Sequence, residues 1–455
     1  MFQPRASVSV MAGWRTPADG KRLGEQMSKK IPGLFALLAF LGLILFLINC
    51  GTSSSRPAGV LYVLSQGENN VGSYAIDLGN GRLSLINKTA AADTTPSSIL
   101  LDSTGTVAFV LNTGSNSITA YTISSDGSLS TPTSTSIPVE NSVAIARDAA
   151  GKFLLVVSQG SIPLPQPPPI NNRCGFPPDP NILPEPNSVC PHLSVFAIQS
   201  GSTSLTLVGN PVPLKGVPTS VTASITGTFN DPGNPGSTVD GTLLHISGNQ
   251  DLVGNNDNTI SEYVMQASGD VTGPLIGSPY STESNPSSVL GVKTTPTGGT
   301  GGLFVYVTNV TTNNLDVFEV CTVTNGSTCS SPNNQDVRNA KMNLIGSPVS
   351  VGLDPVAMTV DPTNNFLYVV NHKSSTVSAF RINPTTGVLS ALNPANVSTG
   401  ADPVAITMHS SGKFLYVSNN GSSNISGFDA STTNGALSNA TNVTSSAQPA
   451  GLVAK

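Results

Sequence analysis

One short strand pattern recurs along the chain and constrains its fold more than any other feature. The three clearest copies are Phe304-Val-Tyr-Val-Thr-Asn309, Phe366-Leu-Tyr-Val-Val-Asn371 and Phe414-Leu-Tyr-Val-Ser-Asn419. An alternating apolar run lies before each copy, and a polar turn with a further alternating run lies after it. Self-similarity at a period of about 40 to 50 residues is typical of a radial or stacked repeat protein.

Each repeat unit holds four short strands. The two clearest units start at Pro355 and Pro403, 48 residues apart. Their four runs alternate apolar and polar residues, which is the period of a half-buried strand. Turn-forming pairs such as Asp-Pro, Ser-Gly and Asn-Gly separate the runs. Because no segment after residue 50 keeps the apolar period of a helix, we predict an all-β chain.

The units add up to a closed ring. Six complete units start at Pro96, Asn141, Pro218, Pro286, Pro355 and Pro403. Residues 60–86 supply the last three strands of a seventh unit, and residues 448–454 supply its first strand. Pairing the two ends of the chain in one sheet removes the open edges that a linear array would leave. We therefore predict a seven-bladed β-propeller of four-stranded antiparallel blades, closed by pairing 448–454 with the strands of 60–86. A ring of six or eight blades is the alternative if a degenerate unit is miscounted.

The sequence Tyr306-Val-Thr-Asn309 resembles the signature after which a group of bacterial seven-bladed propellers is named. The chain is similar to these proteins, and to the wider lactonase-like family that includes 6-phosphogluconolactonases, over about residues 60–455. The resemblance implies a propeller and, as one activity, lactone hydrolysis by His and Arg near the starts of the channel-lining strands. Those starts carry Ser, Thr, Pro, Val or Ala here, which counts against transferring the activity.

The N-terminal region resembles a bacterial lipoprotein signal. The basic segment Met27-Ser-Lys-Lys30 precedes an apolar stretch at 31–48, and Cys50 follows it as the expected lipidated residue. Asn49 departs from the small residue usual before that cysteine, so an uncleaved membrane anchor is the alternative. We expect an untranslated or disordered leader (1–26), a signal peptide (27–50), a linker (51–59) and the propeller (60–455). The predicted location is the bacterial cell envelope, periplasmic or on the outer surface.

The remaining four cysteines favour two local disulfides, Cys174–Cys190 and Cys321–Cys329, which suit an oxidising compartment. The first pair lies within a proline-rich insertion at about 159–192 in the third blade. An ordered loop of that length is costly to close. It is either a rigid flap over the channel mouth or a tolerated surface insertion.

Five polar residues are candidates for ligand binding at the channel. Asp354 and Asp402 precede prolines at strand starts, and His372 lies in a turn between a second and a third strand. Arg147 and Glu140 are charges near another channel strand. Both aspartates could also be simple turn caps.

Other polar residues are weaker candidates. The remaining histidines, His192, His245 and His409, are expected to be structural or solvated. Oxygen ligands at Asp251, Asp257 and Glu262 suggest a weak calcium site that lacks EF-hand spacing. No cofactor is expected, and the sequence has no phosphate-binding glycine loop, Gly-x-Ser-x-Gly or His-Glu-x-x-His motif.

Composition excludes nucleic acid as a partner and leaves two main functions. Only 10% of the residues are charged and the net charge is −5, so no electrostatic steering of nucleic acid is expected. The favoured hypothesis is a lipid-anchored binding or scaffold protein for a protein, glycan or small molecule. The alternative is a lactone hydrolase, and assembly into a surface layer is a third hypothesis.

Overall fold

A computed structural model describes residues 57–137, 140–160, 190–234, 236–251, 255–295, 301–321 and 340–455. Every element it defines in these ranges is a β-strand, as predicted. None of these residues forms a helix long and apolar enough to span a membrane. The predicted leader, signal peptide and Cys50 lie outside the described residues, as does most of the insertion at 159–192.

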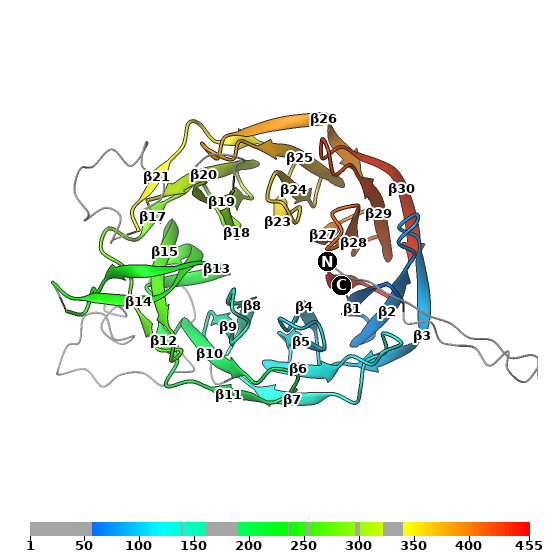
Figure 1. Cartoon of the computed structure of the whole chain (residues 1–455), viewed down its shortest axis with the longest axis horizontal. Coiled ribbons are helices and arrows are strands. Elements are labelled where there is room, and N and C mark those ends of the chain that lie inside the picture. Colours follow the sequence, from blue (N-terminus) through cyan, green and yellow to red (C-terminus); the bar gives the residue numbers. More distant parts are fainter. Residues whose placement is uncertain are drawn as a thin grey trace, which may run out of the picture. The chain divides into compact units, whose positions relative to one another are not determined.

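The strands form seven antiparallel sheets arranged as blades around a ring (Figure 1). Blade one contains β1 (Gly59–Ser65), β2 (Asn70–Ile76), β3 (Leu83–Ala91) and the C-terminal strand β31 (Pro449–Ala454). Blade two contains β4 (Pro96–Leu101), β5 (Val107–Asn112), β6 (Ser117–Thr122) and β7 (Thr133–Ser136). Blade three contains β8 (Ser142–Arg147), β9 (Phe153–Ser158), β10 (His192–Ile198), β11 (Leu205–Leu207) and β12 (Val212–Pro213).

The other four blades follow in chain order. Blade four contains β13 (Gly216–Asn230), β14 (Thr238–Asp251), β15 (Asn256–Gln266), β16 (Val271–Thr272) and β17 (Tyr280–Ser281). Blade five contains β18 (Pro286–Lys293), β19 (Leu303–Asn309), β20 (Asn314–Val320), β21 (Met342–Leu344) and β22 (Val349–Ser350). Blade six contains β23 (Pro355–Val360), β24 (Phe366–Asn371), β25 (Thr376–Ile382) and β26 (Leu389–Ser398). Blade seven contains β27 (Pro403–Met408), β28 (Phe414–Asn419), β29 (Asn424–Ala430) and β30 (Leu437–Thr444).

The ring closes as predicted from the split seventh unit. Strand β31 pairs antiparallel with β1, with Tyr62 opposite Val453 and Val63 opposite Leu452. The innermost strands β31, β4, β8, β13, β18, β23 and β27 each contact the innermost strand of the next blade. One buried apolar cluster lies between each pair of neighbouring blades, so the core is distributed around the ring.

The tyrosine of the repeated signature joins one blade to the next. The Tyr368 hydroxyl donates to the carbonyl of Gly435 at 2.8 Å, and the Tyr306 hydroxyl donates to that of Gly387 at 3.0 Å. Tyr62 and Tyr416 make the same contact with Gly127 and Gly81. These glycines have positive φ (75° at Gly435), and a Cβ at 435 would clash with the Phe366 ring. The signature therefore fastens neighbouring sheets together.

The asparagine that ends the signature ties the second strand to the third. The Asn371 side-chain amide donates to Thr376 at 3.1 Å and to Ser378 at 2.9 Å. Its carbonyl oxygen accepts the N–H of Gly352, in the connection that leads into β23, at 3.1 Å. The asparagine thus holds the turn after the second strand next to the start of the first strand. The candidate site lies on this face of the blade.

Candidate functional site

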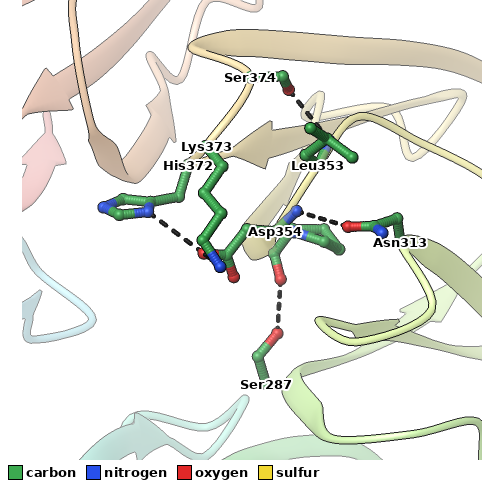
Figure 2. Close-up of polar contacts among 8 residues, drawn as sticks. Ser287, Asn313, Leu353, Asp354, His372, Lys373 and Ser374 are labelled. Atoms are coloured by element: carbon green, nitrogen blue, oxygen red, sulfur yellow. Dashed lines mark hydrogen bonds and ion pairs between the residues drawn. The ribbon is translucent and has the colours of Figure 1, made fainter.

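A three-residue cluster lies on that face of blade six. One carboxylate oxygen of Asp354 is 3.3 Å from Nδ1 of His372 and 3.3 Å from Nζ of Lys373. Asp354 is largely buried, at 14% side-chain exposure, whereas His372 is 32% exposed and Lys373 is 68% exposed. Figure 2 shows the second ring nitrogen of His372 directed away from Asp354. We call Asp354, His372 and Lys373 the rim cluster.

The backbone around the rim cluster is the same as at equivalent positions of other blades, and we call it the backbone frame. Asp354 precedes the proline that starts β23 and has a φ of 60°, and its carbonyl accepts the His372 N–H at 2.8 Å. The same backbone hydrogen bond joins Thr113 to Thr95 and Asn420 to Asp402 in other blades. Turn and strand start are therefore adjacent in each of these blades, whatever their side chains are.

Blade five holds the start of β23 in place. The Asp354 N–H donates to the side-chain oxygen of Asn313 at 2.8 Å, and Ser287 donates to the carbonyl of Pro355 at 2.7 Å (Figure 2). Within blade six, the N–H of Leu353 donates to the Ser374 hydroxyl at 3.1 Å. These bonds fix the backbone of Asp354, so its carboxylate is oriented before any ligand arrives.

The structure brings Asp354 and His372 together but not the other predicted residues. Asp402 is exposed and repeats the Asp354 backbone frame, with Asn420 in the place of His372. Glu140 is exposed, and its carbonyl accepts the N–H of Gly160 in blade three. Arg147 ends β8 at the opposite end of its strand, where its guanidinium lies over Gly151. Sequence reasoning missed Lys373, which directly follows His372.

The three acidic residues of the weak calcium candidate do not converge. Asp251 accepts the backbone N–H of Asn255 at 2.8 Å, and burial together with the charge of Asp251 raises the pKa of Asp257. Glu262 is fully buried and faces His245 instead, at 3.3 Å. Within the described ranges, no group of three or more His, Cys, Asp or Glu side chains could hold a metal ion.

Two histidines are structural, as expected. His192 is buried and its Nδ1 lies 2.7 Å from the carbonyl oxygen of Cys190, and burial lowers its pKa. The Nε2 of His409 lies 3.1 Å from the carbonyl oxygen of Lys455, and burial also lowers the pKa of His409. Both imidazoles therefore contact backbone carbonyls of the fold.

The predicted disulfides involve residues beyond the described ranges. Cys190 and Cys321 are buried at the ends of described segments, and their predicted partners Cys174 and Cys329 lie outside them. The pairing stays a prediction. A pocket of about 290 Å³ lies between the start of β1 and the turn at Ser124, and it shares no residue with the rim cluster.

Comparison with known proteins shows which propellers this chain is similar to. A family model described as "Lactonase, 7-bladed beta-propeller" matches residues 55–161 and 299–401. Among curated proteins, none matches the chain.

Solved structures share the fold at low sequence identity. A Bacteroides fragilis protein provisionally described as a 6-phosphogluconolactonase is 13% identical, with a TM-score of 0.59 over 89% of this chain and 99% of its own. The periplasmic gluconolactonase PpgL of Pseudomonas aeruginosa is 15% identical, with a TM-score of 0.58 over 87% of this chain and 98% of its own. A Lactobacillus plantarum protein is 14% identical, with a TM-score of 0.58 over 87% of this chain and 99% of its own. The resemblance to the lactonase-like seven-bladed propellers that the repeats predicted is confirmed.

Proposed function

We propose that this protein hydrolyses lactones at the rim cluster. The observation that carries the proposal is the contact between His372 and Asp354, in which a largely buried carboxylate holds one nitrogen of a half-exposed imidazole. With a proton on Nδ1 facing Asp354, Nε2 is free to accept a proton from water. The match to the lactonase family model supports the choice of substrate class.

The chemistry needs only the side chains of the rim cluster. Nε2 of His372 takes a proton from water, and the water oxygen attacks the carbonyl carbon of the lactone. The ammonium of Lys373 stabilises the oxyanion that forms. The C–O bond of the ring then breaks, and the imidazolium returns its proton to the leaving alkoxide. Because an exposed ion pair contributes only about 0–1 kcal/mol, Lys373 can leave Asp354 to reach the substrate.

Turnover of a panel of lactones tests this proposal. We expect His372→Ala to reduce kcat/KM by a factor of about 10² to 10⁴, the usual contribution of a general base. Asp354→Asn should also reduce turnover, while Asp402→Asn should not, because Asn420 replaces the histidine in that blade. If no lactone in the panel is hydrolysed by the wild-type protein, the proposal is wrong.

Binding without catalysis is the second hypothesis. It is favoured by the channel-strand starts, where the structure places Ser97, Ser142 and Ser287 rather than His or Arg. In that case the same face would hold a protein, glycan or small molecule. This hypothesis would be supported if the wild-type protein bound such a ligand but hydrolysed no lactone, and if Asp354→Asn abolished the binding.

We further propose that Cys50 carries a lipid that anchors the protein in the bacterial cell envelope. The motivation is the signal-like segment at 27–50. Cys50→Ser should release the protein from the membrane fraction. A protein that stays membrane-bound after this substitution would favour the uncleaved anchor instead.

A further inference from the structure

Blade four contains a row of three polar side chains on its three inner strands. The hydroxyl of Ser224 on β13 lies 3.0 Å from Nε2 of His245 on β14. Nδ1 of His245 lies 3.3 Å from a carboxylate oxygen of Glu262 on β15. His245 and Glu262 are directly opposite each other in the sheet and are both fully buried. We call Ser224, His245 and Glu262 the buried row.

The other six blades show that the repeat does not need such a row. At the position of His245 they carry Tyr62, Phe109, Leu155, Tyr306, Tyr368 and Tyr416. Opposite these residues, at the position of Glu262, they carry Ser73, Ala120, Val195, Val317, Ala379 and Gly427. Blade four thus replaces an aromatic or apolar residue and a small or apolar one by a histidine and a glutamate. Burying two ionisable groups costs free energy, so packing alone does not account for the exchange.

Ser224 also occupies a changed position. In blades two, three and six the equivalent residues are Asp102, Asp148 and Asp361, which accept the N–H of the residue that begins the next strand. Blade four has no turn at this point, because β13 continues to Asn230 and β14 begins only at Thr238. Ser224 therefore has no capping role. Its hydroxyl lies 3.0 Å from Nε2 of His245 and also donates to the carbonyl of Leu243 at 3.2 Å.

The buried row lies in an apolar interface, and Ser224 is the only one of its three members that is not fully buried. Glu262 lies between Ile260 and Val264 on one face of β15, within the cluster that joins blades four and five. Ser224 is half-buried on β13, the innermost strand of its sheet. Across the interface lies Gly291 of β18, where an added Cβ would be only 2.8 Å from Cβ of Ser224. A side chain at position 291 would therefore collide with Ser224, and the glycine lets β18 approach β13 closely.

Backbone donors lie beside Ser224. Because β13 is the terminal strand of its sheet, one edge of this strand faces the channel without a partner strand. The register between β13 and β14 also shifts between Ala223 and Thr226, which takes Ser224 and Ile225 out of regular pairing. Backbone N–H groups on such an edge are the donors that an oxyanion requires.

We propose that Ser224, His245 and Glu262 form a nucleophilic Ser–His–Glu site that cleaves carboxylic esters with a small acyl group at the channel wall. Ser224 is the nucleophile, His245 is the general base, and Glu262 orients the imidazole and stabilises its protonated form. The site is separate from the rim cluster in sequence and in blade, and it lies in the stretch between the two segments that the family model matches.

The reaction proceeds through an acyl-enzyme. Oγ of Ser224 bonds to the carbonyl carbon of the ester while its proton passes to Nε2 of His245. The C–O bond to the alcohol then breaks, and the alcohol leaves with that proton. Water repeats the sequence on the acyl-serine, releasing the acid and restoring the hydroxyl. No oxidant, metal or second substrate is needed.

The charge state of the buried row is consistent with this chemistry. Burial lowers the pKa of His245 to about 3, so its imidazole is neutral before the reaction. Burial raises the pKa of Glu262 well above its usual range. Blade five presents two ionisable side chains to this interface: Lys293, on the same face of β18 as Gly291, and Asp316, opposite Val307. Loss of the Glu262 proton leaves a carboxylate that stabilises the imidazolium, so the serine should react faster as the pH rises.

An alkyl fluorophosphonate probe tests the proposal on the full-length protein. Ser224 should displace fluoride and form a covalent phosphonyl adduct, which peptide mass spectrometry locates. We expect Ser224→Ala to abolish labelling and His245→Gln to slow it at least about 100-fold. Ser220→Ala is the matched control, because Ser220 lies on the same strand with comparable exposure, and it should label at the wild-type rate.

Two further measurements keep the test decisive. Labelling of the wild-type protein should increase between pH 6 and pH 9, and Gly291→Ala should slow it by narrowing the space beside Ser224. The proposal is overturned if the folded wild-type protein forms no adduct at pH 9, or if the adduct lies on a residue other than Ser224. Because these outcomes come from the wild-type protein, they hold even where a variant of the buried row fails to fold. Lactone turnover at the rim cluster should be unchanged in Ser224→Ala.

Discussion

The rim cluster and the buried row both pair a histidine with a carboxylate at 3.3 Å, but they arise from the repeat in opposite ways. In the rim cluster the backbone has the same hydrogen bonds as in other blades, and only the side chains differ. The buried row replaces residues that elsewhere fasten the blades together. A change on the exposed frame leaves the fold intact, whereas a change in the interface affects stability. The two sites should therefore respond very differently to substitution.

The largest effect on stability is expected from separating His245 and Glu262. His245→Leu leaves the buried glutamate without its partner and should lower the free energy of unfolding by about 3 kcal/mol. The double variant His245→Tyr with Glu262→Ala restores the pattern of the other blades and should be at least as stable as wild type. Urea denaturation at pH 7 measures both. A double variant less stable than His245→Leu would show that the buried row is needed for packing.

A pH series separates the contribution of Glu262 from that of the rest of the protein. Burial raises its pKa above the ordinary value of 4.5, so its stabilising effect is complete below that pH and is lost as the pH rises toward the folded-state pKa. The unfolding free energy of wild type relative to Glu262→Gln should fall above pH 4.5, by up to about 1.4 kcal/mol per pH unit. A difference independent of pH would mean that Glu262 is ionised in the folded protein.

The tyrosine contacts between blades should have a smaller effect. Tyr368→Phe removes the hydroxyl that donates to the Gly435 carbonyl and should cost about 1 kcal/mol in the free energy of unfolding. The equivalent change Tyr62→Phe is the matched comparison in blade one. If neither variant loses stability in thermal or urea denaturation, the interface depends on the rings alone.

The smallest effect is expected at Asp402. Its side chain is exposed, and its role in the fold is carried by the backbone carbonyl that accepts the N–H of Asn420. Asp402→Asn keeps a residue that tolerates a positive φ, so the unfolding free energy should change by less than about 0.5 kcal/mol. A larger loss would show that this carboxylate has a partner of its own.

The architecture could be predicted well from the sequence because the same pattern of strands and turns recurs seven times. The alternating runs and the split unit at the two ends correctly placed the strands and the closure between β1 and β31. The aspartate before a proline and the histidine in a turn were correctly placed on one face, because β-strand pairing makes those positions adjacent. Arg147 was a candidate because it lies near a channel strand, and the structure places it at the end of that strand away from this face.

The buried row was not predicted, although the sequence contains a signal for it. Alignment of the blades puts His245 where four blades have the signature tyrosine. The serine and glutamate, however, come from strands whose register the sequence does not specify. The β-bulge at Ser224 and the extended hairpin of blade four shift that register. For the same reason Glu262 was named only as part of a weak calcium candidate and not as a partner of His245. Cross-strand neighbours in an irregular blade need the three-dimensional structure.

The most direct test is to measure lactone turnover for wild type, His372→Ala and Ser224→Ala side by side. Ester cleavage and phosphonyl labelling at Ser224 serve as the second readout. We expect His372→Ala to lower lactone turnover by a factor of about 10² to 10⁴ and to keep the adduct at Ser224. Ser224→Ala should abolish the adduct and keep lactone turnover. Lactone turnover that survives His372→Ala and disappears with Ser224→Ala would contradict the assignment of the rim cluster as the lactone-hydrolysing site.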